Sequence, residues 1–508
     1  MFGSRIREWG PLDWCVALVV VLALVAGGIL GARKLMQKCD GGLHEVAGEC
    51  VGVTSESFDA DPGIESLLQA VADENSRVAD EGGDTPYVRL ALMMPFTSDG
   101  NSAMTPDMIR RALAGALAGL QEANSGQGGP QFQLLLAPDG RNLGQWKPVV
   151  DDLVKKQGDD NAPLVGVTGI PSSQTETQAA LDELSERHIP AVGPVITASS
   201  MNYPYFFKTS PNNKEFAKAL AGYLKRYPQK KNGLLLWDRR QGDVYSDDLR
   251  HALLGRFGKE YGFKAHNSSF TGSSGNDQGV PQLFYDAVNK ICRDKSDTVF
   301  FAGRDQDLPA FINALAGDSS CDRKTPVRIL KIGIGLEPTL TTEQTERDLR
   351  TANATIVDSS SFDPAWEKQG ARGRPTGIDD FLDRFDTLKT AHTLGDKPLD
   401  DGYAASYYDG VRLLTQATGR SFSQINAGKT TKRLPTAKDV YNNLSQSTSG
   451  GTTCAGCLQG ATGTYGFSGL DRNDQWSACK PVPVVEFPPS KRVVPLYRTY
   501  EDDGACPG

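Results

Sequence analysis

The sequence predicts an α/β fold of two doubly wound parallel-sheet lobes that follow an N-terminal transmembrane helix. From residue 86 onward, short runs rich in valine, leucine and isoleucine alternate with amphipathic helical patterns, which is typical of parallel sheets covered by helices. The pattern fills two successive blocks, so we expect two lobes. At 508 residues the chain is long enough for roughly two to four domains. One uncharged apolar stretch near the N-terminus predicts the membrane helix.

The apolar stretch is Cys15–Leu30, which carries no charged residue and, with the two small residues after it, reaches the lower limit of length for spanning a bilayer. Basic residues flank it on both sides, so the positive-inside rule does not fix its orientation. A cleaved signal peptide is the alternative, but no small-x-small cleavage site precedes the basic stretch. Cys39 also lacks the small-residue context of a bacterial lipoprotein cysteine. We therefore expect residues 1–38 to form a cytoplasmic tip and a single-pass anchor in the cell membrane, with the bulk of the chain extracytoplasmic.

Eight cysteines follow the apolar stretch, and an even number beyond a membrane segment indicates disulfides in an oxidising compartment. Cys39 and Cys50 bracket a glycine-rich decapeptide and are predicted to pair, and Cys292 and Cys321 could join two helix ends. The Cys454-x-x-Cys457 motif lies in loop-like sequence without a second such pair, so we interpret it as a structural disulfide rather than a redox or zinc motif. The pairing among the last four cysteines stays open, namely Cys454, Cys457, Cys479 and Cys506.

Residues 39–85 are predicted to form a disulfide loop and a polar stalk rather than a domain. The part from Ser55 to Thr85 is acidic and polar, with a possible helix over Gly63–Val78. Charge is spread along the rest of the chain, and the net charge of −8 with a pI of about 5.4 argues against a nucleic-acid-binding surface. We therefore expect no nucleic-acid partner.

The first lobe is predicted from four strand–helix units that begin near residue 86. An apolar stripe at near-helical spacing follows Pro106, which suits the first turn of a helix. Strands are expected at Val88–Met93, Gln131–Ala137, Leu164–Val167 and Ala191–Ile196. Helices are expected at Pro106–Asn124, Trp146–Lys156 and Gln174–Arg187.

A second α/β lobe is predicted after Tyr203–Ser210, a segment that leaves the first lobe. Its expected strands are Gly233–Trp237, Thr298–Ala302 and Val327–Ile334. Its expected helices are Asn212–Arg226, Tyr245–Tyr261 and one that ends near Ala316.

Two loops rich in small hydroxyl residues mark a candidate binding site in the first lobe. Thr168–Ser173 and Thr197–Ser200 each follow a predicted strand, and a helix begins after the first loop. Ligands of open α/β sheets bind at the carboxyl ends of the strands, where hydroxyls, backbone N–H groups and a helix N-terminus suit a carboxylate or another small polar solute. The alternative is an ordinary helix cap beside an ordinary turn.

The order of several local patterns resembles the type I periplasmic solute-binding proteins, in the leucine/isoleucine/valine-binding branch of ABC transporter substrate-binding proteins. The similar segments span roughly residues 86–500. They are VRLALMMPFTSDG, DMIRRALAGAL, LVGVTGIPSSQTETQA, PAVGPVITASS with YFFKTSPNNKEFAKALAGYL, TVFFAGRDQDLPAFINAL, SYYDGVRLL and GTYGFSGLDRNDQ. Residues 1–85 and the membrane anchor fall outside the resemblance.

The resemblance implies a bilobed domain over residues 86–508 that closes like a hinge on a ligand. Lobe 1 would comprise about 86–205 and 360–460, and lobe 2 about 206–359 and 461–508. The chain would cross between lobes near Tyr205, near Thr355–Asp363 and near Gly460–Tyr465.

Eight residues are carried over to the expected ligand site from that resemblance. It implies that two serines meet a ligand carboxylate, that a threonine and the backbone near a valine meet an ammonium group, and that an aspartate pairs with this ammonium from lobe 2. One tyrosine would face the cleft from lobe 2, and a tyrosine and a phenylalanine could wall the side-chain pocket. In that order the residues are Ser172, Ser173, Thr197, Val195, Asp307, Tyr245, Tyr408 and Phe96.

Several of these residues have structural alternatives. Tyr245 could simply begin a helix, Asp307 could cap one, and one tyrosine of the Tyr407-Tyr408 pair is expected in the core. The sequence also departs from the family, because Arg304-Asp305 brings charge to a loop that is usually small and aromatic. Lobe 2 has Tyr245-Ser246 where the family usually has a Tyr-Gly pair. These departures bear on which solute is bound.

No pattern typical of catalysis or of a cofactor stands out. The five histidines are scattered without metal-ligand spacing, and no nucleophile elbow or Walker A motif occurs. Gly333-x-Gly335 follows a strand, but the residues after it do not open a phosphate-binding helix. We expect no enzyme activity, no cofactor and no metal.

Three functions therefore stay open. The first is a solute-binding component that delivers an amino acid or related compound to an ABC permease. The second is a membrane-tethered sensor or degenerate binding ectodomain that partners another membrane protein. The third and weakest is an extracytoplasmic hydrolase.

Overall fold

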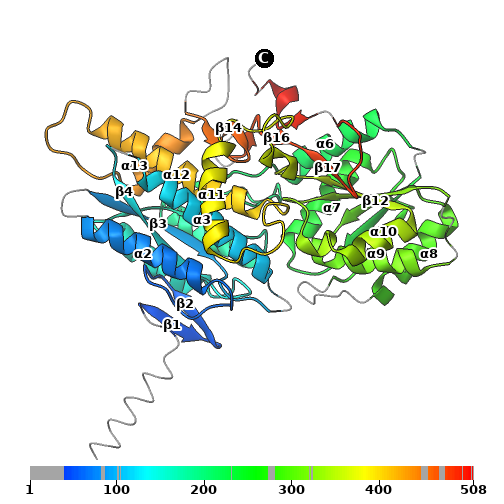
Figure 1. The fold of residues 1–508 in the computed structure, drawn as a ribbon, viewed down its shortest axis with the longest axis horizontal. Helices are drawn as coiled ribbons and strands as arrows, with labels where there is room; N and C mark the ends of the chain where they lie inside the picture. The colour runs from blue at the N-terminus through cyan, green and yellow to red at the C-terminus, as the bar shows by residue number, and fades with distance from the viewer. Residues whose placement is uncertain are drawn as a thin grey trace, which may run out of the picture.

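The computed structural model describes residues 39, 41–81, 86–99, 102, 104–126, 128–229, 232–272, 281–319, 321, 324–447, 456–467, 475–494, 496–504 and 506. The predicted anchor Cys15–Leu30 lies outside these residues. Among the helices that are described, none combines the length and the apolar composition that a bilayer crossing requires. The described chain forms two α/β lobes side by side, the first at the left and the second at the right of Figure 1.

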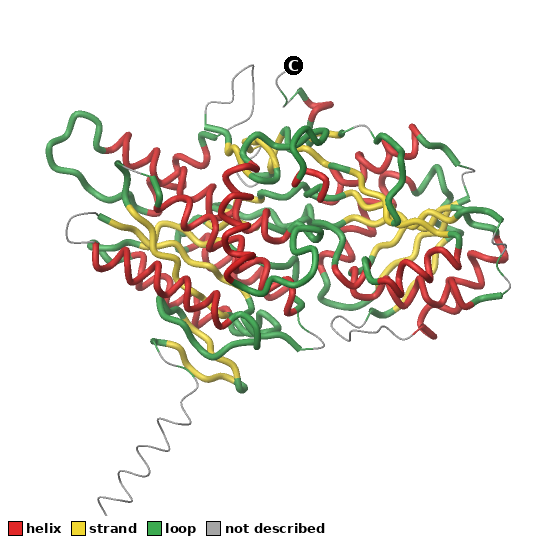
Figure 2. The backbone as a smooth tube through the Cα atoms, viewed as in Figure 1, coloured by secondary structure: helices red, strands yellow, loops and turns green. Residues whose placement is uncertain are grey.

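Lobe 1 is built on a five-stranded parallel sheet with the order β4-β3-β5-β6-β7. Figure 2 shows the strands between two layers of helices. The chain starts in β3, places β4 on one side and the remaining strands on the other, so the order reverses beside β3. The strands are β3 (Tyr87–Met94), β4 (Gln131–Pro138), β5 (Leu164–Thr168), β6 (Ala191–Gly193) and β7 (Phe206–Lys208).

Each face of this sheet is covered because the strands are apolar on both sides. In β3, Leu90 and Leu92 belong to one hydrophobic core, while Ala91 and Met93 belong to the other. The first core takes α2 (Glu65–Glu81), α3 (Pro106–Asn124), α11 (Ile378–Ala391), α12 (Tyr403–Ile425) and α13 (Ala437–Ser445). The second takes α4 (Trp146–Gln157) and α5 (Thr175–Glu186). This alternation confirms the predicted doubly wound arrangement.

The expected stalk is instead part of lobe 1. The helix α2 buries one apolar face: Leu67, Leu68 and Val71 pack in the first core, and Val78 is also buried. Before it, the hairpin β1 (Leu43–Val46) and β2 (Glu49–Gly52) leads to Thr54, whose backbone makes two hydrogen bonds of 2.8 and 2.9 Å with Leu136 at the edge strand β4. The polar composition of residues 55–85 hid this apolar stripe, and so the expectation of a free stalk was wrong.

Lobe 2 is built on a six-stranded sheet with the order β17-β12-β11-β10-β8-β9, parallel except for β17. One face is covered by α6 (Asn213–Arg226) and α7 (Val244–Phe257), and the other by α8 (Tyr285–Asp294), α9 (Leu308–Gly317) and α10 (Glu343–Ala352). The strands are β8 (Gly233–Asp238), β9 (Asn267–Phe270), β10 (Thr298–Ala302), β11 (Val327–Ile332), β12 (Ala354–Ser359) and β17 (Val484–Phe487).

Two of the points where the chain crosses between the lobes lie a few residues later in the sequence than expected. Because β7 still pairs with β6, the first crossing lies between Lys208 and α6 rather than near residue 205. The last return is also later, because β14 (Gly463–Phe467) packs on lobe 1, where the rings of Phe207 and Phe467 lie 5.1 Å apart. β14 pairs with β13 (Leu458–Gly460) and β15 (Ser477–Ala478) in a small antiparallel sheet beside the crossings.

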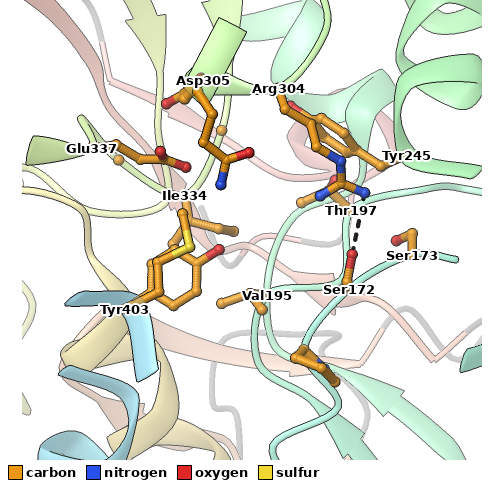
Figure 3. Close-up of a pocket in the computed structure, with 15 residues that line it drawn as sticks. Ser172, Ser173, Val195, Thr197, Tyr245, Arg304, Asp305, Ile334, Glu337 and Tyr403 are labelled. Carbon is orange, nitrogen blue, oxygen red and sulfur yellow. Dashed lines mark hydrogen bonds between the residues drawn. The ribbon is translucent and has the colours of Figure 1, made fainter. Parts of the chain in front are cut away.

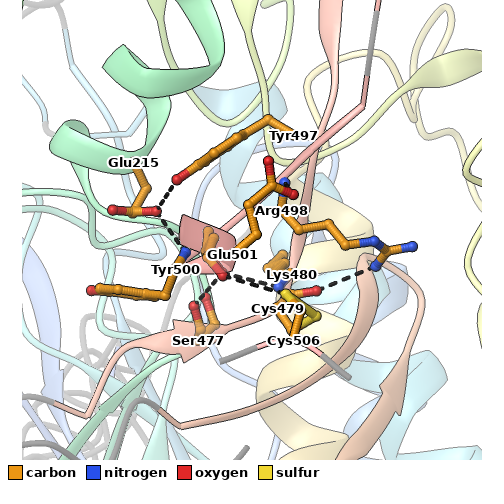
Figure 4. The surroundings of a disulfide bond; sticks show 10 residues. Glu215, Ser477, Cys479, Lys480, Tyr497, Arg498, Tyr500, Glu501 and Cys506 are labelled. Carbon is orange, nitrogen blue, oxygen red and sulfur yellow. Dashed lines mark hydrogen bonds between the residues drawn. A yellow bond between two sulfur atoms is a disulfide. The ribbon is translucent and has the colours of Figure 1, made fainter. Parts of the chain in front are cut away.

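Three disulfides are present in the described residues. Cys39 pairs with Cys50 and Cys292 with Cys321, as predicted, and the structure resolves a pairing that the sequence left open, Cys479 with Cys506. Cys457 is also disulfide-bonded, and Cys454 lies outside the described residues. The Cys479–Cys506 bridge holds the C-terminal segment against α6, together with the short strands β16 (Pro481–Val482) and β18 (Tyr497–Arg498) (Figure 4). There the carboxylate of Glu215 accepts hydrogen bonds from the Tyr497 hydroxyl at 2.7 Å and the Tyr500 backbone N–H at 2.8 Å.

Candidate solute-binding site

The two sheets present their topological switch points to each other, and a cavity of about 70 Å³ lies between them. In lobe 1 the order reverses beside β3 and β5, and in lobe 2 beside β8 and β10, so the loops after β5, β8 and β10 meet. The lining residues come from both lobes. They are Met108, Pro171, Ser172, Ser173, Val195, Thr197, Tyr245, Arg304, Asp305, Gln306, Gly333, Ile334, Gly335, Glu337 and Tyr403 (Figure 3).

Lobe 1 contributes a wall of hydroxyl groups. Ser172 and Ser173 follow β5, and Val195 and Thr197 follow β6. All four are more than nine-tenths buried. The backbone carbonyl of Ser173 accepts a hydrogen bond of 3.1 Å from the backbone N–H of Tyr245, which directly joins the two lobes.

Arg304 lies opposite these serines, in the loop after β10. Its Nε and Nη2 donate hydrogen bonds of 2.8 Å to the two carboxylate oxygens of Asp243, and Nη2 also lies 3.3 Å from the hydroxyl of Ser172. The guanidinium lies 5.5 Å from the centre of the Tyr245 ring. Burial works to raise the pKa of Asp243, but the neighbouring guanidinium of Arg304, with that of Arg240, outweighs it and holds this pKa below its usual value.

A buried ion cluster stands behind the lobe 2 wall. The ammonium of Lys331 lies 2.9 Å from Asp305 and 2.8 Å from Asp358, and it donates a 3.0 Å hydrogen bond to the carbonyl of Gly335. None of the three charged side chains is more than 8% exposed. Burial raises the pKa of Asp358 to about 7 despite the lysine. One lysine therefore serves two carboxylates and fixes both Asp305 and the loop that carries Gly335.

Glu337 and Tyr403 form the side of the cavity opposite Arg304, and their polar ends point into it (Figure 3). Glu337 follows the Gly333–Gly335 loop, and Tyr403 begins α12. Among the described residues, the Glu337 carboxylate has no ion-pair partner. Burial, followed by the charge of Asp305, raises the pKa of Glu337 well above its ordinary value.

The lobes also touch on this second side of the cavity. The backbone N–H of Leu336 donates a 2.9 Å hydrogen bond to the carbonyl of Asp400, just before α12. The neighbouring Asp401 is held by a fully buried ion pair with Arg111 of α3, at 2.8 Å. The cavity is thus bounded by direct contacts between the lobes at both ends.

No protein-family model matches the chain, and no curated protein matches it. Solved structures do match. The branched-chain amino acid transporter substrate-binding protein LivJ from Streptococcus pneumoniae, solved with isoleucine, is 16% identical, with a TM-score of 0.53 over 78% of this chain and 95% of that one. The leucine-binding protein LivK from Thermotoga maritima is 12% identical, with a TM-score of 0.53 over 82% and 99%. An ABC transporter solute-binding protein from R. palustris, solved with benzoate, is 14% identical, with a TM-score of 0.53 over 81% and 97%.

The chain has the type I periplasmic solute-binding fold. This confirms the resemblance drawn from the sequence at the level of fold. Two of these three structures are described as binding proteins of transporters, and the third as a leucine-binding protein. One of them was solved with isoleucine and another with benzoate, so the fold alone does not decide the charge of the ligand.

Within this fold, five of the eight carried-over residues line the cavity and three do not. Ser172, Ser173, Val195, Thr197 and Tyr245 all meet there. Phe96 and Tyr408 lie in the core of lobe 1 instead, where Phe96 packs on Phe58 at 5.4 Å and Tyr408 on Phe381 at 5.1 Å.

Asp307, expected to face the ligand, is fully buried and does not line the cavity. The chain turns through the short 3-10 helix η2 (Asp305–Asp307) directly after the loop, so Arg304 and Asp305 reach the cavity and Asp307 turns into lobe 2 at the start of α9. The acidic residues that lobe 2 does bring to the cavity are Asp305 and Glu337.

Four further residues with chemistry at the cavity were not assigned to it from sequence, namely Arg304, Asp305, Glu337 and Tyr403. The first two were visible as charged departures from the resemblance. Tyr403 and Tyr407 are four residues apart, so they lie on the same face of α12, and Tyr408 lies on another face. A helical projection of this segment could therefore have distinguished Tyr403 from Tyr408. For Glu337, the only sequence feature that could have indicated a place at the cavity is its position after a glycine-containing loop.

Proposed function

We propose that this chain is an extracytoplasmic solute-binding protein that captures a small polar solute with an ammonium group, an amino acid or related compound, for an ABC permease. The observation that carries the proposal is the Glu337 carboxylate, which points into the cavity between the lobes and has no ion-pair partner among the described residues. A buried carboxylate is costly unless a cation or a proton compensates it. A ligand ammonium beside Glu337 and the Tyr403 hydroxyl would supply that compensation.

The opposite side of the cavity suits the polar end of such a solute. The hydroxyls of Ser172, Ser173 and Thr197 can donate or accept hydrogen bonds there. No hydrogen bond joins the Nη1 of Arg304 to a described residue, so this group can donate to a ligand oxygen. A volume of about 70 Å³ corresponds to roughly five to seven water positions, which favours a solute the size of alanine over that of a large aromatic compound.

Delivery to a permease and attachment to the membrane belong to the same proposal. Three disulfides among the described residues support an oxidising compartment outside the cytoplasm. The uncharged stretch Cys15–Leu30 would hold the binding domain at the membrane surface, within reach of a permease. Carbonate extraction of membranes tests the anchor: a protein that pellets with the lipid supports it, and release into the supernatant rejects it.

A thermal-shift screen of small amines, amino acids and carboxylates on the purified full-length chain tests solute binding. A ligand at about 100 times its Kd stabilises the native state by about 2.7 kcal/mol, which appears as a higher melting temperature. Val195→Trp would fill the cavity and should abolish the shift, whereas Val493→Trp on the surface should keep it. A shift that survives in the Val195 variant would place the solute elsewhere.

The second candidate, a tethered sensor or degenerate ectodomain, is favoured by one contact. Arg304 reaches across to Ser172 by itself, so lobe-to-lobe contact on this side needs no solute. If no compound in the screen shifts the melting temperature, this second function replaces the first.

A further inference from the structure

The positive charge at the hydroxyl side of the cavity is already neutralised. Both carboxylate oxygens of Asp243 accept hydrogen bonds from Arg304 at 2.8 Å, and both side chains are largely buried, with exposed fractions of 4% and 13%. The other polar groups on this side are the neutral hydroxyls of Ser172, Ser173 and Thr197. A ligand carboxylate placed here would find hydrogen-bond donors but no net opposite charge.

The opposite side carries an excess of negative charge. Lys331 is shared by Asp305 and Asp358, at 2.9 and 2.8 Å, so this cluster is one positive charge short. Glu337 adds a carboxylate that lies within the electrostatic reach of Asp305. The charged residues that line the cavity are Arg304, Asp305 and Glu337. Together with the ion pairs directly behind them, three cationic side chains (Arg304, Arg240 and Lys331) meet five carboxylates (Asp238, Asp243, Asp305, Asp358 and Glu337).

We infer that this cavity selects a solute with a net positive charge, an alkylammonium whose other end is a neutral hydroxyl or amide, over a zwitterionic amino acid of the same size. This inference rests on the proposed function and narrows the class of its ligand. A net cation reduces the buried negative excess, whereas a zwitterion leaves it unchanged and adds a carboxylate next to an ion pair that is already satisfied.

In the free protein a proton on Glu337 can take the place of the solute's charge. The charged and titratable groups that surround Glu337 are Asp305, Lys331, Asp401, Arg304 and Tyr403, and burial with Asp305 raises the pKa of Glu337 well above its usual value. An ammonium that binds beside Glu337 favours the ionised carboxylate. Binding should therefore release protons to the solvent.

Four ligands that share one three-carbon skeleton distinguish the effect of the ligand's ammonium group from that of its carboxylate group. L-Alaninol carries the ammonium alone, L-alanine carries ammonium and carboxylate, L-lactate carries the carboxylate alone, and (S)-1,2-propanediol carries neither. Calorimetric titration of the full-length chain near neutral pH should rank alaninol first. The ammonium should improve affinity by about thirtyfold or more over the diol, since charge pairs that are desolvated on binding are worth that much. The carboxylate should lower affinity, so that alanine binds less tightly than alaninol.

The second part of the experiment repeats these titrations with the Glu337→Gln variant, because glutamine keeps the size of the side chain and removes its charge. In this variant the advantage of alaninol over the diol should fall by about tenfold or more, and the release of protons, measured in buffers of different ionisation enthalpy, should disappear. Glu343→Gln, whose side chain is 93% exposed in the first turn of α10, is the control and should change neither quantity. Tighter binding of alanine than of alaninol overturns the cation inference and leaves the proposed function intact. Binding of none of the four rejects both.

Discussion

The guanidinium of Arg304 holds the carboxylate of Asp243 through two hydrogen bonds of 2.8 Å, and this pair joins the loops that follow β10 and β8. The contact lies at the switch point of the lobe 2 sheet, where Arg304 also reaches Ser172 of lobe 1 at 3.3 Å. A buried ion pair of this kind is costly to break from one side, because the remaining charge is left without compensation. It thus fixes the wall of the cavity as well as the contact between the lobes.

Replacing Arg304 by Met should lower the free energy of unfolding by about 3 kcal/mol, the lower end of the range for breaking a buried pair, because Arg240 still faces Asp243 at 3.2 Å. Arg347→Met is the matched control, since its ion pair with Glu343 is exposed and should be worth less than about 1 kcal/mol. Urea unfolding of both variants gives the comparison. Equal losses would mean that the Arg304 pair contributes no more than a surface pair.

Gly335 should control how closely the lobes can meet. A methyl group at this position would lie 2.5 Å from the backbone carbonyl oxygen of Asp400 in lobe 1, so Gly335→Ala strains only the form in which the lobes touch. At a cost of about 1–3 kcal/mol, ligand affinity should fall by roughly five- to 150-fold in a calorimetric titration. Gly255→Ala in α7 meets no neighbouring atom and should leave affinity unchanged. Unaltered affinity in the Gly335 variant would show that the solute does not require this contact.

Asp139 should make the stability of lobe 1 fall as the pH rises. Burial, followed by the charge of Glu49, raises its folded-state pKa to about 8, far above the ordinary value of 3.8. The folded state then binds more protons than the unfolded state between these values, so its contribution is fully present below about pH 4 and is lost toward pH 8.

Asp139→Asn removes that dependence, and it should gain stability relative to the unmutated protein as the pH rises, by at most about 1.4 kcal/mol per pH unit. Denaturant unfolding at several pH values measures the difference, with Asp247→Asn, which is 65% exposed, as the control. A difference that is constant from pH 5 to about 8 would refute the raised pKa.

The helix α2 should be an integral part of lobe 1. Leu68→Ala removes a fully buried side chain from its core and should destabilise the protein by about 2–5 kcal/mol. Ser76→Ala lies on the exposed face of the same helix and should change stability by less than about 0.5 kcal/mol. Thermal or urea unfolding checks both. A Leu68 variant as stable as the Ser76 variant would restore the picture of a free stalk.

The sequence predicted the two sheets because strand and helix patterns are local. The runs at Leu164–Thr168 and Thr298–Ala302 are mostly apolar, as strands buried on both faces tend to be, and every residue in them is buried. The hydroxyl loop after the first run led directly to Ser172 and Ser173. A helix was also predicted where α2 lies, but its packing into lobe 1 was not, because its apolar positions are spaced around one face within a polar segment.

The residues that lobe 2 contributes to the site could not be predicted in the same way, because their positions depend on interactions between segments far apart in the sequence. Asp307 was predicted at the site because it lies in the loop that follows a strand. In the structure this loop continues into the 3-10 helix Asp305–Asp307, so Arg304 and Asp305 line the cavity and Asp307 is buried in lobe 2. Glu337 stands out because Lys331 already pairs with two other carboxylates, those of Asp305 at 2.9 Å and Asp358 at 2.8 Å. Which carboxylates a lysine pairs with can be seen only in the folded structure.

The most direct test of the whole account is a calorimetric comparison of the unmutated chain and Glu337→Gln, titrated with the amine that produces the largest thermal shift. If Glu337 meets the ligand ammonium in this cavity and the pair is desolvated on binding, the variant should lose about 2–5 kcal/mol of binding free energy, or about thirtyfold or more in affinity. The unfolding midpoint of the ligand-free variant should change little, because glutamine keeps the size of the side chain and no ion pair with a described residue is lost. Equal affinity in the two proteins would contradict the assignment of this cavity as the solute-binding site.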